Sequence, residues 1–266
     1  MSTHIHPTAI VDASARLGVE VRVGPYAVIE EGCEIGDYCE VRAHAVICGR
    51  STLGPHNQVG YGAVIGSEPQ DYGYKGTASR VEIGSGNKIR EYVTIHRASK
   101  EGGVTRVGND NFLMGGVHLG HDVQIGNNVI LANNVLLGGH VQIGDRAFLG
   151  GATIAHQFVR VGTLAMTRGG TPLSKDVPPY FMAVEWNQLS GTNRVGLRRA
   201  GLSHETRRAI QAAYELIYRS GLNVSQALTE LRSKFHFPEI AHLIEFISNS
   251  KRGICRDRDR AAEDEE

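Results

Sequence analysis

The sequence predicts a mainly β protein: a parallel β-helix built from hexapeptide repeats, followed by a small α-helical C-terminal domain. Three observations predict this fold. An aliphatic residue recurs at every sixth position through most of the first 161 residues. The chain is rich in glycine, with 33 among 266 residues, whereas only 6% of its residues are aromatic. From residue 194 onward, apolar residues recur instead at the spacing typical of helices.

The repeat of six begins near the N-terminus. Eleven consecutive steps, from Ile5 to Ile65, fall on Ile, Leu or Val, and the same register resumes at Ile83 and runs on from Val107 to Val161. Neither a helix nor a flat amphipathic strand has a period of six. Six residues fit one short strand and one turn, and three such sides close a coil of 18. Coils of this kind stack by parallel strand pairing at about 4.8 Å per coil.

Two polar stretches, near residues 66–80 and 97–106, interrupt the repeat without shifting its register. Loops inserted into a solenoid usually gather on one face and often carry function. We therefore expect a β-helix domain over residues 1–186, with these two loops near its functional site.

A helical domain is expected over residues 187–256. Ser203 is a suitable N-cap for its main helix, and further helical patterns start at Val224 and Pro238. This region is basic, with 11 Lys and Arg against 5 Asp and Glu between residues 194 and 256. Residues 257–266 are too charged and too poor in apolar residues to fold, so we expect a disordered tail.

Composition argues against several classes of protein. The 28 basic and 28 acidic residues balance, so no global positive field favours a nucleic-acid partner. No apolar run approaches the ~18–20 residues that span a bilayer, and the N-terminus lacks the features of a signal peptide. The four cysteines form neither a metal-binding pair nor a disulfide framework. We therefore expect a cytoplasmic protein without an integral membrane segment, a metal or another cofactor.

Histidines and glycines alternate in the stretch from residue 112 to residue 157. In a coil of 18, residues 18 apart lie one above another, so one patch across three coils should contain His121, Asp122, Gly139, His140, His156 and Gln157, with His118 close by. A neutral imidazole beside a carboxylate can act as a general base, and a backbone N–H uncovered at a glycine can stabilise an oxyanion. Three imidazoles would also suit zinc. Solvated, inert histidines are a third interpretation.

The chain resembles the UDP-N-acetylglucosamine O-acyltransferases, the enzymes that start lipid A synthesis. The resemblance covers nearly the whole chain and is carried by residues 6–11, 70–71, 80–84, 90–91, 93–97, 118–122, 131–134, 139–141, 156–158, 176–180, 213–214 and 216–221. It implies a left-handed parallel β-helix, a handedness that the repeat itself does not reveal.

The resemblance implies transfer of an (R)-3-hydroxyacyl chain from acyl carrier protein to the 3-hydroxyl of UDP-N-acetylglucosamine. His121 would be the general base, Asp122 its orienting partner and the Gly139 N–H the oxyanion donor. The resemblance also implies contacts with the sugar nucleotide from Asp71, His118, His140, His156, Gln157, Asn193 and Arg199. The family works as a homotrimer with active sites between subunits, so the loop of Asp71 would serve a neighbour's His121. The basic C-terminal helices would help to bind the acyl carrier protein.

Met166 and Gly169 match the region that measures acyl-chain length in this family, and Gly169 would leave room for a long chain. Gly73 and Ala200 stand at two positions that the family often fills with a basic residue. Three alternatives stay open: N-acylation of a 3-amino sugar nucleotide by the same base, a zinc-dependent γ-type carbonic anhydrase, and a non-catalytic binding solenoid. The basic helical domain and the histidine spacing argue against the carbonic anhydrase.

Overall fold

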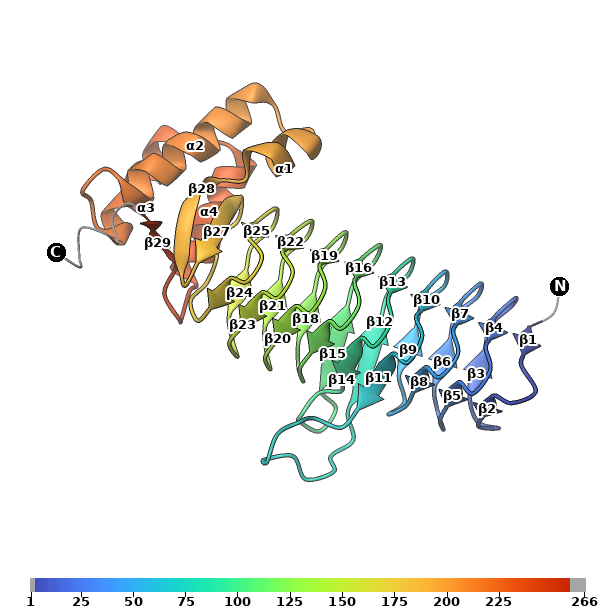
Figure 1. Cartoon of the computed structure of the whole chain (residues 1–266). Helices are drawn as coiled ribbons and strands as arrows, with labels where there is room; N and C mark the ends of the chain where they lie inside the picture. The colour runs from blue at the N-terminus through green and yellow to red at the C-terminus, as the bar shows by residue number, and fades with distance from the viewer. Residues whose placement is uncertain (1–2, 259–266) are drawn as a thin grey trace.

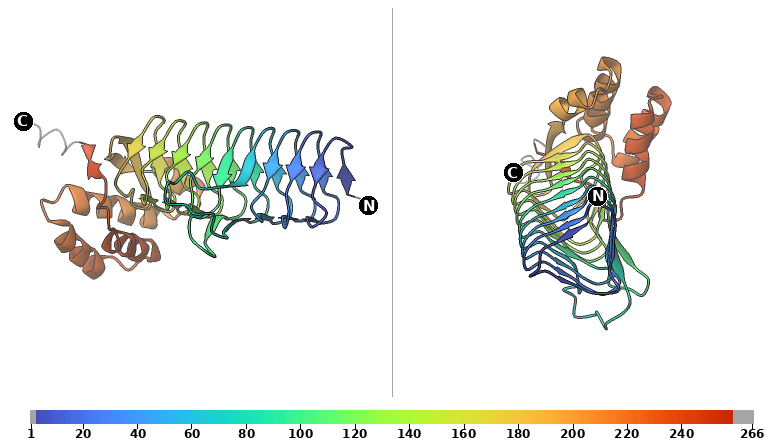
Figure 2. Two further views of the ribbon diagram at one scale, coloured as in Figure 1. Left: turned by 90° about the horizontal axis from the view of Figure 1, so that it is seen from below. Right: turned by 90° about the vertical axis from the view of Figure 1, so that its right-hand side faces the viewer.

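The computed structural model describes residues 3–258 and contains a long parallel β-helix with a helical domain at its C-terminal end (Figure 1). Seen along its axis in Figure 2, the solenoid has coils stacked one on another. Three sheets form its three sides, and we call them sheets A, B and C. The predicted fold class is therefore confirmed.

Each complete coil contributes one short strand to each sheet, and the last two strands of sheet A extend it beyond the solenoid. Sheet A contains β1 (His4–Ile5), β4 (Arg22–Val23), β7 (Glu40–Val41), β10 (Gln58–Val59), β13 (Lys88–Ile89), β16 (Phe112–Leu113), β19 (Ile130–Leu131), β22 (Phe148–Leu149), β25 (Met166–Thr167), β27 (Phe181–Glu185), β28 (Gln188–Thr192) and β29 (Arg256–Asp257). Sheet B contains β2 (Ile10–Val11), β5 (Val28–Ile29), β8 (Val46–Ile47), β11 (Val64–Ser67), β14 (Thr94–His96), β17 (His118–Leu119), β20 (Leu136–Leu137), β23 (Ile154–Ala155) and β26 (Pro172–Leu173). Sheet C contains β3 (Arg16–Leu17), β6 (Glu34–Ile35), β9 (Thr52–Leu53), β12 (Arg80–Ile83), β15 (Val104–Val107), β18 (Gln124–Ile125), β21 (Gln142–Ile143) and β24 (Arg160–Val161).

The register of the strands confirms the coil of 18. Leu119 of β17 pairs in parallel with Leu137 of β20, and Ile125 of β18 pairs with Ile143 of β21. The repeated aliphatic residues point inward, and from Val23 onward almost all of them are fully buried. These ladders of stacked aliphatic side chains form the core of the solenoid.

The two insertions leave the solenoid at the same edge. The first lies between β11 and β12, and the second lies between β14 and β15. They touch each other, because the Ala78 carbonyl accepts a hydrogen bond from the Gly102 N–H at 2.7 Å. Figure 1 shows them projecting side by side from the β-helix.

The helical domain contains α1 (Arg194–Arg199), α2 (His204–Tyr218), α3 (Val224–Lys234) and α4 (Pro238–Ser248). The three helix starts expected from the sequence are confirmed, and the Ser203 hydroxyl accepts a hydrogen bond from the Thr206 N–H as an N-cap does. The short helix α1 was not predicted. The antiparallel β27–β28 hairpin spans residues 186 and 187, where the sequence places the domain boundary.

Polar contacts join the helical domain to the last coils. The Asp176 carboxylate accepts hydrogen bonds from the Arg160 N–H and from the Ser250 hydroxyl, while the Arg160 guanidinium lies 4.0 Å from the ring centroid of Phe246 in α4. The disordered tail predicted over 257–266 begins too early, because Asp257 is buried in β29, where it pairs with Arg219; residues 259–266 lie outside the described residues. Within residues 3–258, no helix has both the length and the apolar character needed to cross a membrane.

Candidate active site

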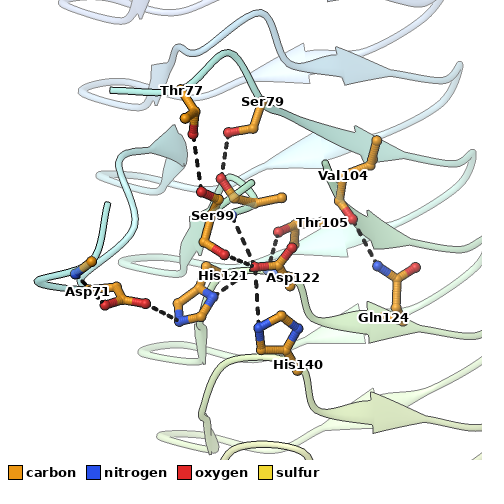
Figure 3. Close-up of polar contacts among 12 residues, drawn as sticks. Asp71, Thr77, Ser79, Ser99, Val104, Thr105, His121, Asp122, Gln124 and His140 are labelled. Carbon is orange, nitrogen blue, oxygen red and sulfur yellow. Dashed lines mark hydrogen bonds and ion pairs between the residues drawn. The ribbon is translucent and has the colours of Figure 1, made fainter. Parts of the chain in front are cut away.

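His121 and Asp122 form the corner between sheets B and C, where the chain turns from β17 to β18. Asp122 has a φ of 61°, in the left-handed region that aspartate tolerates better than most residues do. This turn brings His121 Nδ1 to 2.8 Å from Asp122 Oδ2 (Figure 3). Because a charged carboxylate can only accept, Nδ1 carries a proton, and in the neutral imidazole Nε2 then has the free lone pair. The His121 imidazole is buried, with an exposed fraction of 5% for the residue.

Asp122 is fixed from the second insertion. The backbone N–H and the hydroxyl of Ser99 donate to Asp122 Oδ2 at 3.0 and 2.7 Å, and the Asp122 N–H donates to Thr105 Oγ1 at 2.8 Å. Burial alone would raise the pKa of Asp122, but the hydrogen bonds from His121 and Ser99 bring this pKa below its ordinary value. Asp122 is therefore a carboxylate at neutral pH.

Gly139 lies one coil above His121, as the stacking predicts. A Cβ atom at position 139 would come within 2.4 Å of His121 Cε1, so only glycine lets the imidazole lie flat against the backbone. Among the described residues, the Gly139 N–H donates to no acceptor, whereas its carbonyl accepts from the Phe158 N–H at 3.0 Å. A free N–H beside the imidazole is the arrangement that an oxyanion donor requires.

His140 follows Gly139 and stands above Asp122. Its ring stacks on Phe158, with centroids 4.6 Å apart, and meets the His121 ring edge-on at 5.2 Å. Burial lowers the pKa of His140 from its ordinary value, although the nearby Asp122 charge opposes that shift. His140 is therefore a neutral neighbour of the His121–Asp122 pair at neutral pH.

Asp71 approaches His121 from the opposite side. Its Oδ2 lies 3.7 Å from His121 Nε2. The loop is anchored by Arg97, which donates to the Gly66 carbonyl at 2.9 Å and to the Tyr74 hydroxyl at 3.2 Å. The resemblance led us to expect that this loop reaches the His121 of a neighbouring subunit, whereas here it reaches the His121 of its own chain.

His118 lies on sheet B beside His96, which the sequence did not predict as a site residue. Its Nδ1 is hydrogen-bonded to Thr94 Oγ1 at 2.8 Å, and its ring centroid is 5.1 Å from that of His96. Burial lowers the pKa of His118 to about 4 and also lowers that of His96. Thr94 and His96 precede the second insertion, and their stacking against His118 could have been found by counting coils across that insertion.

His156 and Gln157 lie at the corner between sheets B and C, one coil beyond His140, and both are exposed. The predicted patch across three coils is confirmed by the backbone contacts, since the His140 N–H donates to the His121 carbonyl and the Phe158 N–H to the Gly139 carbonyl. Sequence reasoning missed Ser99 and Thr105, because both lie in or beside an insertion whose register the repeat does not define.

Four predicted residues lie outside this patch. Asn193 is buried and caps α1, with its Oδ1 accepting from the Gly196 N–H and its Nδ2 donating to the Leu164 carbonyl. Arg199 is exposed near the end of α1. Met166 and Gly169 belong to the coil of β25, and Gly169 lies at the corner between sheets A and B. Around Gly169, an added Cβ would meet only backbone atoms of Gly151 within 4 Å, the nearest at 3.3 Å.

His121, Asp122 and His140 each offer one possible metal ligand, and these atoms lie within 4.8 Å of one another. The zinc interpretation required three imidazoles, but the structure brings together two imidazoles and a carboxylate. Asp122 Oδ2 already accepts hydrogen bonds from His121 and twice from Ser99. The arrangement therefore suits a carboxylate-oriented base better than a zinc ion.

Comparisons with known proteins agree with this geometry. A family model described as UDP-N-acetylglucosamine O-acyltransferase, domain 2, matches residues 176–255, and a bacterial transferase hexapeptide model matches residues 14–49 and 105–139. The acyl-[acyl-carrier-protein]–UDP-N-acetylglucosamine O-acyltransferase of Syntrophobacter fumaroxidans is 45% identical, over 95% of this chain and 99% of its own. The enzyme of the same name from Halorhodospira halophila is 43% identical, over 96% and 100%. The crystal structure of a UDP-N-acetylglucosamine acyltransferase from Bacteroides fragilis aligns with a TM-score of 0.91 at 43% identity, covering 95% of this chain and all of that one.

Proposed function

The chain belongs to the UDP-N-acetylglucosamine O-acyltransferase family, and we propose on this basis that it starts lipid A synthesis. It transfers an (R)-3-hydroxyacyl chain from acyl carrier protein to the 3-hydroxyl of UDP-N-acetylglucosamine. The observation that carries the proposal is the His121–Asp122 hydrogen bond of 2.8 Å, which leaves His121 Nε2 facing the loop of Asp71.

The chemistry follows from that pair. His121 Nε2 takes the proton of the sugar hydroxyl as the hydroxyl oxygen attacks the thioester carbonyl carbon. Negative charge then develops on the carbonyl oxygen, where the Gly139 N–H stabilises it. When the intermediate collapses, the C–S bond breaks and the thiolate of the carrier leaves with the proton that His121 held. Asp122 stabilises the imidazolium throughout, and no metal takes part in any step.

The sugar nucleotide lies along the corner between sheets B and C. The residues that contact the sugar nucleotide surround His121 on successive coils. They are Asp71, His118, His140, His156 and Gln157. The diphosphate end of the sugar nucleotide extends toward α1 and Arg199. Asn193 acts there by holding the start of α1, because both polar atoms of its amide are already hydrogen-bonded.

The active enzyme is a homotrimer. Sheet C presents a polar outer face, whereas the outer faces of sheets A and B are apolar near the site, at Phe112, Ile130, Phe148 and Met166 on sheet A and at Leu136 and Ile154 on sheet B. Leu136 and Ile154 are 40% and 51% exposed in the single chain. Two different apolar faces that share an edge suit a head-to-tail ring of subunits.

The acyl-chain ruler also favours a site between subunits. Gly169 and Met166 lie near the corner between sheets A and B, whereas His121 lies at the corner between sheets B and C. Within one chain, sheet B separates the two. A neighbouring subunit would bring its own Gly169 alongside the acyl chain held at His121, and the absence of a side chain at that position suits a long chain.

The helical domain binds the acyl carrier protein. A cavity of about 370 Å³ beside α1 and α2 is lined by Arg194, His204, Arg207 and Arg208 and by no carboxylate of the described residues. Such a surface attracts an acidic carrier. The reaction takes place in the cytoplasm, where the carrier and the sugar nucleotide meet.

The test is a transfer assay followed by mass spectrometry, with UDP-N-acetylglucosamine and 3-hydroxyacyl carrier proteins of several chain lengths. We expect acylated sugar from the native protein, and a rate lower by a factor of about 10²–10⁴ in His121→Ala because the general base is gone. His56→Ala is the matched control, since His56 is also a corner histidine but stacks on Tyr38 far from the site.

Each other outcome has a defined meaning. Equal rates in the native protein and His121→Ala would contradict the catalytic role of this patch. Product from the 3-amino analogue of the sugar nucleotide alone would replace O-acylation with N-acylation. Loss of transfer on metal chelation, restored by zinc, would overturn the metal-free mechanism.

A further inference from the structure

Within residues 3–258, Ser99 is the one residue of the second insertion whose side chain hydrogen-bonds to a side chain of the His121–Asp122 pair, since Thr105 bonds only to the Asp122 backbone. Its hydroxyl and its backbone N–H both donate to Asp122 Oδ2, at 2.7 and 3.0 Å. The same oxygen accepts from His121 Nδ1 at 2.8 Å. One carboxylate oxygen therefore receives three donors, two of which belong to Ser99 (Figure 3).

Ser99 is itself held by the first insertion. The Thr77 hydroxyl donates to the Ser99 carbonyl at 3.1 Å, and the Ser79 hydroxyl donates to the carbonyl of Ala98. The Ala78 N–H also donates to Glu101 Oε2 at 2.9 Å. The loop that brings Asp71 to one side of His121 thus also supports the residue that fixes Asp122 on the other side.

We propose that Ser99 is a positioning residue for acyl transfer, which holds the Asp122 carboxylate so that His121 keeps its proton on Nδ1 and accepts another on Nε2. This inference rests on the proposed function. Without the Ser99 hydroxyl, Asp122 Oδ2 keeps only the Ser99 N–H and His121 Nδ1 as donors, so the carboxylate and the imidazole bonded to it can tilt together. His121 would then lose its fixed ring orientation, and a misplaced base transfers a proton more slowly.

Ser99 also weakens the attraction between the Asp122 carboxylate and a protonated His121. Hydrogen bonds to a carboxylate spread its charge, so Asp122 attracts a protonated imidazole less strongly while Ser99 is in place. The titratable groups around the pair are Asp71 and His96 beside His121, and His140 beside Asp122. Lys100 acts on His140, and Arg97 acts on His96. Burial lowers the pKa values of His96 and His140, so both are neutral near pH 7.

The test compares Ser99→Ala, Ser99→Thr and the native protein in the transfer assay across pH. We expect Ser99→Ala to lower kcat about tenfold, the factor typical of losing one hydrogen bond to a charged group. The KM for UDP-N-acetylglucosamine should change by less than about twofold, because Ser99 does not face the sugar site. The acidic limb of kcat/KM should move up by about half a pH unit, since Asp122 then stabilises protonated His121 more strongly. Ser99→Thr restores the hydroxyl and should restore both values.

Ser14→Ala is the matched control. The Ser14 N–H and hydroxyl both donate to Asp12 Oδ1, at 2.8 and 2.7 Å, which copies the Ser99–Asp122 geometry in the first coils without a histidine. This variant should keep the native kcat and pH profile. If Ser99→Ala loses its fold by circular dichroism, Ser99→Cys keeps the volume with a weaker donor and should show the same two changes.

Three results would overturn the inference. Native kcat and pH profile in Ser99→Ala, together with an inactive His121→Ala, would refute the positioning role and leave the proposed function intact. A loss of kcat in Ser99→Ala that Ser99→Thr does not restore, with an unmoved acidic limb, would mean that Ser99 acts only on loop structure. An active His121→Ala would instead refute the general base itself, and the positioning role with it.

Discussion

Gly139 and the imidazole of His121 are in closer contact than any side chain at position 139 would allow. We propose that the N–H of this glycine is the donor to the oxyanion. The structure gives Gly139 a second role, because its bare Cα is the surface against which the His121 ring lies. A methyl group added at position 139 would leave the backbone N–H in place but would displace the His121 ring.

We predict that Gly139→Ala lowers kcat by a factor of about 10² or more while the melting temperature changes by only a few degrees. The new Cβ would lie 2.4–2.5 Å from atoms of the imidazole, so the ring must move and Nε2 leaves its place. Steady-state kinetics and thermal unfolding measure the two effects. Gly115→Ala is the control, since its Cβ would meet only the flexible ends of Glu91 and Asn133. Native kcat in Gly139→Ala would contradict the packing role.

The sequence predicted residue contacts only where the repeat supplies a register. His121, Gly139 and Gln157 could be stacked by counting in steps of 18, and the structure confirms that stacking. Ser99 could not be placed in this way, because a hydrogen bond from an irregular loop depends on the path of that loop. Asp71 has the same limitation: its residue type was found through the resemblance, but its contact with His121 in the same chain came from the structure.

Among the elements, the start of the first insertion is anchored by the side chain of Arg97. The Arg97 guanidinium donates to the Gly66 carbonyl and the Tyr74 hydroxyl and forms an ion pair with Glu68 at 3.1 Å. Its side chain is only 16% exposed, so its bonds to Gly66 and Tyr74 are shielded from water better than its ion pair with Glu68, whose side chain is 69% exposed. The loop of Asp71 is therefore ordered before substrate arrives.

We predict that Arg97→Ala raises the KM for UDP-N-acetylglucosamine about tenfold and lowers kcat much less. Without Arg97 the loop must become ordered when the sugar nucleotide binds. The conformational entropy lost in that step weakens the affinity. Kinetics and limited proteolysis of the loop measure the effect. Arg106→Ala is the control, since Arg106 pairs with Glu82 at an exposed site on sheet C. An unchanged KM with a readily cleaved loop would show that loop order does not limit binding.

The helices show where sequence patterns suffice. Ser203 and Pro238 gave the starts of α2 and α4, because a capping side chain and a proline act locally. Helix α1 was missed, since six residues with a glycine among them give no apolar period. The sequence signal for α1 was its N-cap, Asn193, whose side-chain oxygen accepts a hydrogen bond from the N–H of Gly196 three residues later.

For the whole molecule, the proposed trimer can be tested at sheet B. We predict that Leu136→Glu with Ile154→Glu converts trimers to monomers and abolishes transfer, since two carboxylates would be buried in the interface. Both side chains point outward, so the circular dichroism of the β-helix should be unchanged. Light scattering gives the mass in solution.

Gln142→Glu is the matched control, because Gln142 is an outward residue on the polar sheet C. It should leave both the trimer and the activity unchanged. A native protein that is monomeric and fully active would contradict the proposal that the site lies between subunits.

The stacking of coils of equal height has a consequence for how the product length of such an enzyme can vary. Each coil advances the axis by about 4.8 Å, a distance that about four methylene groups of an extended chain also cover. The height of the coil of Gly169 above that of His121 can therefore change only in whole coils. A larger side chain at position 169 would instead shorten the space for the proposed acyl chain in finer steps. A duplicated or deleted stretch of 18 residues between them would work as a coarse adjustment of product length. Substitution at the corner would work as the fine one.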